Sequence, residues 1–324
     1  MKTKILTLLV ILTFAFFSCQ KQDSVEQPAT DLSDVQLKSA SIAVNDVAVE
    51  GVALEANFET DFYAGYQHML RNLAHYKGRK GNLLEGRKDL HYLKGQLPAV
   101  SIDTTVTGYP VIITIDYGDS TVTKNGRVLS GIVKIEISGD KGVDGRTRKI
   151  SFIGCGIDSI GIEGTSIHTL NTDSDTARKM TITSDVTFTL ADGTIITREG
   201  DSVREWIKGL DTLMEGDDDM IQITGSIHVE SSTGDSYTRL ITEPLIRLED
   251  CRYPVQGIVQ YSQNDIVIGE LNYGDGTCDN LTELTTDGET IEIELHGKMP
   301  KADLKGHHHG NMGGKGKNGG MGGH

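Results

Sequence analysis

This chain of 324 residues has little that points directly to chemistry, and each shortage excludes a class of protein. Basic side chains are few: 31 Lys and Arg stand against 46 Asp and Glu, which gives a formal net charge of −15. Nucleic acids and anionic lipid surfaces are recognised through clustered Lys and Arg, so we expect no nucleic-acid partner and no polybasic contact with a membrane. After the N-terminal segment, no apolar run approaches the roughly 18 residues that a membrane-spanning helix needs.

The common sequence motifs of enzymes are also missing. The sequence contains no P-loop, no glycine-rich dinucleotide loop, no G-x-S-x-G nucleophile turn and no H-E-x-x-H zinc motif. We therefore expect a protein that is not an enzyme. The paired carboxylates of glycoside hydrolases leave no local signature, so a hydrolase of envelope polysaccharide or peptide is kept as the enzymatic alternative.

The N-terminus has the composition of a secretory signal. Two lysines precede an apolar run at residues 5–17, which is too short to span a bilayer, and Ser18 and Cys19 follow. With cysteine at the expected cut, residues 1–18 resemble a bacterial lipoprotein (type II) signal peptide, although Phe16 stands where leucine is commonest. The resemblance implies that Cys19 becomes the lipidated N-terminus. Removing both lysines leaves 29 basic side chains against 46 acidic ones, so contact with the bilayer would depend on the lipid.

Only four cysteines are present, and three remain after Cys19 is assigned to lipid. An exported protein meets an oxidising compartment, where cysteines form disulfides. Cys251 and Cys278 flank two strand-like runs and are equally distant from Asn264-Asp265 between them. A two-residue hairpin turn there would place the two cysteines opposite each other, so we predict a disulfide between them. The alternative is three buried free thiols.

The chain divides into segments by composition. Residues 19–50 are polar without a sustained period, and we interpret them as the lipid anchor and a flexible tether. Residues 51–100 contain an amphipathic helix followed by a basic, glycine-containing loop. Residues 101–300 form the β domain described next. Residues 301–324 are dominated by glycine and are interpreted as a disordered tail.

The helix prediction depends on apolar residues that recur at steps of three and four. These residues are Phe58, Phe62, Tyr66, Met69, Leu70 and Leu73. The pattern predicts a helix over residues 58–75 that covers one face or edge of the β domain.

The β domain is predicted from alternating runs rich in Ile, Val, Thr and Tyr. Turn signals separate the runs, and Asn125-Gly126, Asp192-Gly193 and Asp287-Gly288 are typical of type I′ hairpins. Short connections favour an antiparallel arrangement. We predict an all-β fold, an antiparallel meander of about ten to twelve strands that forms a sandwich or a curved open sheet or half-barrel, with one N-terminal amphipathic helix. Residues 202–213 fit either a strand or a helix, and we favour the strand.

Two groups of histidines are candidates for chemistry. The tail carries imidazoles that suit copper, nickel or zinc, without a preformed geometry. These weak candidate ligands are His307, His308, His309 and His324. His168 and His228 lie in similar short contexts within β runs and could converge on a site, although lone strand histidines are more often structural.

Several stretches together resemble a group of β-rich lipoproteins of Bacteroidota-type cell envelopes whose function is unassigned. They are FFSCQKQD, the YGD turns, REWIKG followed by DDDMIQITGS, and LNYGDGTCDNLTELTTDGETIEIEL. The resemblance covers roughly residues 100–296 and implies anchoring to the cell outer membrane, on either its periplasmic or its outer side. It implies no activity, cofactor or site residue.

These observations together predict a lipid-anchored lipoprotein of the cell envelope that acts as a non-enzymatic binding or structural module. Its expected partners are the membrane, through the lipid, and an envelope protein, a glycan or a small hydrophobic ligand. Binding of a hydrophobic ligand requires a concave sheet face lined by Ile, Val and Phe, and a filled interior would argue against it. Binding of divalent metal by the tail is the other specific alternative, and no other cofactor is expected.

Overall fold

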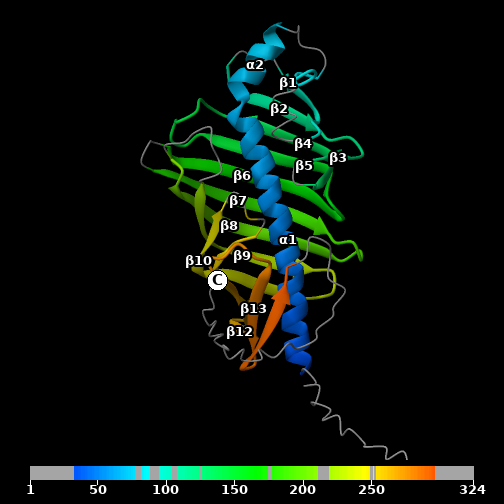
Figure 1. Ribbon diagram of the computed structural model, residues 1–324, viewed down its shortest axis with the longest axis vertical. Helices are drawn as coiled ribbons and strands as arrows, with labels where there is room; N and C mark the ends of the chain where they lie inside the picture. Colours follow the sequence, from blue (N-terminus) through cyan, green and yellow to red (C-terminus); the bar gives the residue numbers. More distant parts are fainter. Residues whose placement is uncertain are drawn as a thin grey trace, which may run out of the picture. The chain divides into compact units, whose positions relative to one another are not determined.

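The protein is described here by a computed structural model, which covers residues 33–76, 82–87, 95–103, 108–123, 126–173, 177–210, 219–248, 251 and 253–295. Fourteen strands form one antiparallel sheet, and neighbours in the sheet follow chain order (Figure 1). The first strands are β1 (Ala99–Asp103), β2 (Val111–Asp116), β3 (Thr121–Val122), β4 (Val128–Ile137), β5 (Thr147–Ile157), β6 (Ile160–Asp173) and β7 (Arg178–Thr189). The remaining strands are β8 (Ile195–Lys208), β9 (Met220–Ser231), β10 (Ser236–Leu248), β11 (Gln256–Gln263), β12 (Ile266–Asp275), β13 (Leu281–Thr286) and β14 (Glu289–Glu294).

The sheet is open, because β1 and β14 do not pair with each other within the part of the chain that the structure describes. The short strand β3 lies off the main path and pairs with β4. The predicted antiparallel all-β class with an N-terminal helix is confirmed in its curved open-sheet form. The sandwich alternative is wrong, since all the described strands belong to a single sheet. The fourteen strands of the described residues exceed the predicted ten to twelve.

Two helices precede the sheet in the part of the chain that the structure describes. Helix α1 (Asp34–Gly65) has 32 residues, and α2 (Gln67–Tyr76) follows after a break at Tyr66. Ser33 begins α1 with a capping box, in which its side chain accepts from the backbone N–H of Gln36 and the Gln36 side chain accepts from the backbone N–H of Ser33. The prediction of a tether up to residue 50 is therefore wrong from residue 34 onward, and the helix predicted over residues 58–75 is in fact the end of α1 followed by α2.

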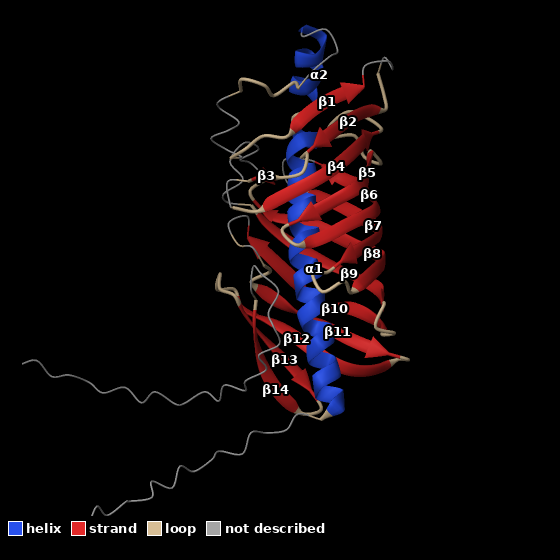
Figure 2. Cartoon of the chain, turned by 90° about the vertical axis from the view of Figure 1, so that its right-hand side faces the viewer, coloured by secondary structure: helices blue, strands red, loops and turns tan. Residues whose placement is uncertain are grey.

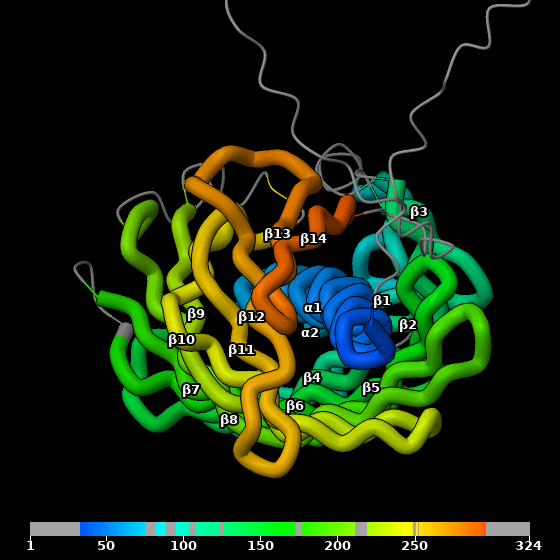
Figure 3. The backbone as a smooth tube through the Cα atoms, turned by 90° about the horizontal axis from the view of Figure 1, so that it is seen from below, coloured from blue at the N-terminus to red at the C-terminus, as the bar shows by residue number. Residues whose placement is uncertain are grey.

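Helix α1 lies along the concave face of the curved sheet (Figure 2). Seen along the helix, the sheet curls around it (Figure 3), with contacts from β4 and β5 and from β12 and β13. Alternate strand residues point inward and join α1 in one continuous hydrophobic core. Small residues such as Ala40, Ala43 and Ala56 lie buried along the helix and allow the sheet to approach closely. Because α1 is covered on more than one side, its apolar residues do not form a single stripe.

Glycines bend the long strands so that the sheet can enclose the helix. Gly164, Gly200, Gly225 and Gly257 have φ between +114° and +152°. A Cβ atom at any of them would lie 2.4–2.5 Å from a carbonyl oxygen of the neighbouring strand. Only glycine fits such positions, and glycine bends of this kind are how antiparallel sheets acquire strong curvature.

The hairpin that carries the predicted disulfide forms as expected. Asn264 and Asp265 both have positive φ (50° and 63°), as a type I′ turn requires, and Gln263 pairs with Ile266. Cys251 and Cys278 are disulfide-bonded, with their Cα atoms 5.8 Å apart. The predicted pairing is confirmed.

The two cysteines do not face each other across the β11–β12 ladder in the way that the turn position alone predicted. Two one-residue register shifts interrupt the β11–β12 ladder, which ends at Gln256 and Asp275, so the cysteines lie beyond the paired strands.

Other local predictions have mixed outcomes. Residues 202–208 belong to β8, so the strand interpretation of this segment is confirmed there. Asp287 and Gly288 form the predicted turn with positive φ at both positions. Asp192-Gly193 does not, because only Gly193 has positive φ and Leu190 bonds with Thr194 across a three-residue loop. Asn125 lies outside the described residues.

Candidate functional site

The most unusual feature of the interior is a cluster of buried charges between α1 and the sheet, here called the Asp46 cluster. Its members are Asp46 and Glu50 from α1, Arg198 from β8, Arg239 from β10 and Tyr261 from β11. Arg239 Nε and Tyr261 Oη each donate to Asp46 Oδ2 over 2.9 Å, and Arg198 also pairs with Asp46. Glu50 Oε2 lies 3.0 Å from Arg198 Nη1 and 3.3 Å from Arg239 Nη2. Two carboxylates thus neutralise two guanidinium groups.

The electrostatics of the Asp46 cluster favour the charged forms. Burial by itself raises the pKa of Asp46, but attraction from Arg198 and Arg239 and hydrogen bonds from Arg239 and Tyr261 outweigh it, so the pKa lies below its ordinary value. Burial opposes protonation of Arg198 as well, yet Asp46 and Glu50 raise its pKa. Burial and the nearby Asp46 raise the pKa of Tyr261 well above 10, which keeps its hydroxyl a hydrogen-bond donor.

A second cluster lies nearer the C-terminal end of α1. Arg148 Nη2 on β5 forms an ion pair with Asp61 Oδ1 at 2.7 Å, and Arg204 Nη1 on β8 donates to Asp61 Oδ2 over 2.9 Å. Burial raises the pKa of Asp61, but the two arginines outweigh it and hold the pKa below its usual range. Two strands that are separated by β6 and β7 in the sheet are thereby joined to one carboxylate of the helix.

His168 lies against this second cluster and is 1% exposed. Its Nε2 is 3.1 Å from Ser166 Oγ. The pKa of His168 is lowered to about 3, chiefly by burial and also by Arg148 and Arg204, while Asp61 acts in the opposite direction. The imidazole is therefore neutral at physiological pH and is enclosed beneath the helix.

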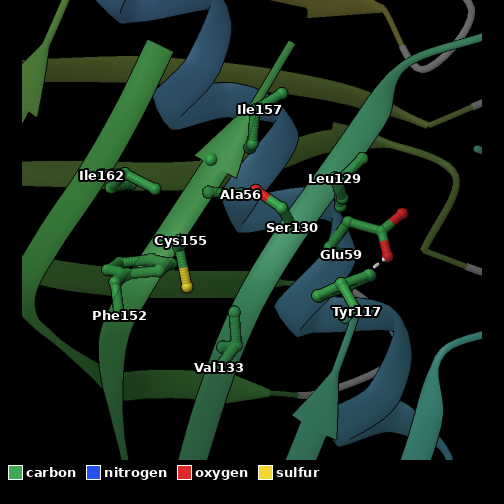
Figure 4. Close-up of a pocket in the computed structure, with 11 residues that line it drawn as sticks. Ala56, Glu59, Tyr117, Leu129, Ser130, Val133, Phe152, Cys155, Ile157 and Ile162 are labelled. Atoms are coloured by element: carbon green, nitrogen blue, oxygen red, sulfur yellow. Dashed lines mark hydrogen bonds between the residues drawn. The ribbon is translucent and has the colours of Figure 1, made fainter. Parts of the chain in front are cut away.

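A small cavity lies between α1 and strands β4 and β5 (Figure 4). It has a volume of about 20 Å³, and its lining includes Glu59, Tyr117 and Cys155. Tyr117 donates to Glu59 over 2.8 Å, and burial together with Glu59 raises the pKa of this phenol well above 10. Burial also raises the pKa of the Cys155 thiol, so it is protonated at neutral pH. A space of this size accommodates about one water molecule.

This arrangement is suited to holding α1 in place against the sheet. The carboxylates of the Asp46 cluster and Asp61 are all engaged by arginines, and His168 is covered. Among the described residues, no group of three or more His, Cys, Asp and Glu side chains has the arrangement of a metal site.

The structure separates some of the predicted site residues. His168 faces the interior from β6, whereas His228 on β9 is exposed beside Glu230, so the two histidines do not converge. Cys19 and the tail histidines lie outside the described residues. The predictions of lipidation and of metal binding there stay predictions.

The arginines of the two clusters were not predicted from the sequence, although the alternation of residues in β8 indicated them. Period-two alternation in β8 places Arg198 and Arg204 on the same face as the buried Ile196 and Trp206. An arginine at an inward position of a strand needs a buried acidic partner. The alternation therefore pointed to carboxylates on the covering element, but it could not identify which ones.

Comparisons of the chain with protein-family models, with curated proteins and with solved structures found no match. Neither α1 nor α2 is long and apolar enough to cross a membrane, and no other helix occurs in the described part of the chain. The fold and its interior thus define a class in structural terms: an open, strongly curved antiparallel sheet whose concave face is filled by the protein's own helix and joined to it by buried ion pairs.

Proposed function

We propose that this protein is an outer-membrane lipoprotein, acylated at Cys19, that serves the cell envelope as a rigid, non-enzymatic binding or structural module. One observation supports a rigid, non-enzymatic module: α1 occupies the concave face of the sheet and is held there by the Asp46 cluster and by Asp61. A module of this kind meets an envelope protein or glycan through its outer surface.

The filled interior argues against a carrier of hydrophobic ligands. Ligand pockets usually enclose roughly 300–1,000 Å³, whereas the cavity beside Glu59 measures about 20 Å³. The inward Ile, Val and Phe side chains that such a ligand would contact pack against α1 instead. A carrier would have to expel the helix and leave several buried arginines without their acidic partners, which is strongly unfavourable.

The anchoring half of the proposal is tested by mass spectrometry of the native N-terminus and by membrane fractionation. We expect an acylated N-terminal Cys19 and a membrane-bound protein, and we expect the Cys19→Ala variant to leave the membrane fraction. A free Cys19 thiol on a protein found in the soluble fraction would overturn anchoring.

A cross-link tests whether α1 stays on the concave face of the sheet at all times. A Cβ atom at Gly269 on β12 would lie 3.6 Å from Ser39 Cβ on α1, within the range that disulfides span. The variant Ser39→Cys/Gly269→Cys therefore locks the helix to the sheet, and the two single variants are the controls. Apart from the acyl group at Cys19, we expect locked and wild-type proteins purified from envelopes to carry no bound lipid. Lipid that co-purifies with wild type and is lost on locking would contradict the proposal and favour a carrier.

A further inference from the structure

The end of the molecule where α1 begins exposes apolar side chains. Ile266 and Val267 follow the β11–β12 turn and are 68% and 52% exposed. In the first turn of α1, Val35 is 53% exposed and Leu37 is 44% exposed. We call these four residues the N-terminal rim.

Three contacts place the members of the rim at the same end of the fold. Ser39 Oγ on α1 donates to the backbone carbonyl of Ile268, one residue beyond Val267, over 2.7 Å. Lys38 Nζ pairs with Asp235 in the β9–β10 turn at 3.0 Å, and Gln263 Nε2 donates to Ser236 O at 3.1 Å. The first turns of α1 are therefore joined to the two hairpins that end beside it. Figure 3 views the molecule from this end.

The length of chain before α1 points to what the rim meets. If Cys19 carries the lipid, as the proposed function holds, residues 20–33 connect the bilayer to the start of α1. Fourteen residues span at most about 50 Å when fully extended. The anchor is thus attached to the fold at the rim, whereas the far end of the 32-residue helix lies about 48 Å from the point of attachment.

We propose that the N-terminal rim rests in the interface of the membrane to which the protein is anchored, with Ile266 and Val267 at the level where headgroups meet acyl chains. Apolar side chains of this type strengthen and orient a lipid-anchored protein at a bilayer, because one anchor alone leaves the body free to tilt. Acidic residues border the rim, among them Asp34 and Asp265, so the matching surface is zwitterionic rather than anionic.

Tryptophan fluorescence in vesicles of brominated lipid tests the inference. The acylated full-length chain is reconstituted in phosphatidylcholine vesicles with or without brominated acyl chains. The single native Trp206 is buried in the core and provides a constant background. The test variant is Ile266→Trp, and the matched control is Ile153→Trp, because Ile153 on β5 is 53% exposed in the other half of the sheet.

We expect brominated lipid to reduce the added fluorescence of Ile266→Trp at least about twofold and to leave that of Ile153→Trp unchanged. Equal quenching of the two variants, or no quenching of either, would overturn the inference. A blue-shifted but unquenched signal from Ile266→Trp would also overturn it, because the rim would then be covered by protein, such as a second copy of the chain.

The same samples distinguish this inference from the proposed function on which it rests. Flotation of the vesicles first shows whether the acylated chain is bound at all. A chain that does not float contradicts anchoring itself. A chain that floats with an unquenched Ile266→Trp leaves anchoring intact and removes only the membrane contact of the rim.

Discussion

At the scale of residues, the position of α1 depends on charged side chains that are buried in the interior. Asp46 receives three donors from three different strands, and its side chain is fully buried. A buried ion pair contributes little net stability compared with an apolar contact, but removing one partner leaves the other uncompensated. The clusters under α1 are therefore best understood as devices that specify one position of the helix.

Replacing the central carboxylate tests that role. We expect Asp46→Asn to lower the free energy of unfolding by about 3–5 kcal/mol, because Arg198 and Arg239 lose their shared negative partner. Urea denaturation followed by circular dichroism measures the change. Asp185→Asn on the outer face of β7 is the control, with an expected effect below about 0.5 kcal/mol. A loss below about 1 kcal/mol in Asp46→Asn would mean that the cluster does not hold the helix.

His168 gives a prediction about pH. Its pKa falls from 6.5 to about 3 on folding, so the unfolded chain binds more protons than the folded one between these values. Above pH 6.5 the neutral, buried His168 therefore costs no stability, and protonation of the unfolded chain lowers the free energy of unfolding by roughly 5 kcal/mol in total as the pH falls toward 3. We expect His168→Gln to flatten the dependence between pH 7 and pH 5 in urea titrations. An unchanged slope in the variant would show that other groups are responsible.

At the scale of elements, the fold depends on the match between a straight helix and strands that bend around it. Positive-φ glycines such as Gly200 supply the bends, and small residues on α1 supply the close approach. Neither feature is effective alone, because a flat sheet would leave most of α1 exposed to water.

The bend in β8 can be tested at Gly200, where φ is +152° and a Cβ atom would lie 2.5 Å from Ser226 O. We expect Gly200→Ala to cost about 3 kcal/mol or more, because backbone strain and a collision with the neighbouring strand add together. Gly288→Ala is the control, since Gly288 has φ +79° with nothing within 4 Å of the added atom. Strain alone should cost about 1–2 kcal/mol there. Equal losses in thermal or urea unfolding would argue against the steric explanation.

The disulfide joins the end of β10 to the loop after β12 and closes a sequence separation of 27 residues. Chain entropy predicts about 3 kcal/mol of stabilisation for a loop of this length. We expect Cys251→Ala/Cys278→Ala to lose about that much in urea unfolding. Reductant should lower the free energy of unfolding of the wild type to that of the variant, and it should leave the stability of the variant unchanged. Cys155 is present in both proteins, so a reductant effect on the variant would contradict the assignment.

At the scale of the whole molecule, the described fold lies between two terminal segments that carry its most specific predicted chemistry: a lipid at Cys19 and metal ligands in the tail. Metal binding by the tail is tested by calorimetry with Cu²⁺, Ni²⁺ and Zn²⁺ on the intact chain and on a chain that ends at Leu304. We expect binding by the intact chain and its loss on truncation, because imidazole and thioether ligands are then removed. Equal binding by both chains would exclude the tail as the site.

Much of the sheet could be predicted because its signals are local. Strand runs, the Asn264-Asp265 turn and the cysteines equidistant from it are all readable within about thirty residues of sequence. The beginning of α1 was missed for a physical reason. A helix covered on several sides needs no apolar stripe, and Asp46 and Glu50 look like surface residues until their arginine partners are known. The capping box at Ser33 and Gln36 was the one local signal that marked its start.

The sequence by itself determined the class of fold, the antiparallel order of the strands and the cysteine pair, because alternation and turn chemistry act between neighbours along the chain. Only the tertiary structure decided that the sheet is a single one, that its concave face is occupied, and which carboxylate meets which arginine. Those outcomes depend on contacts such as that between Asp46 and Arg239, which lie 193 residues apart, and no local pattern encodes such a distance.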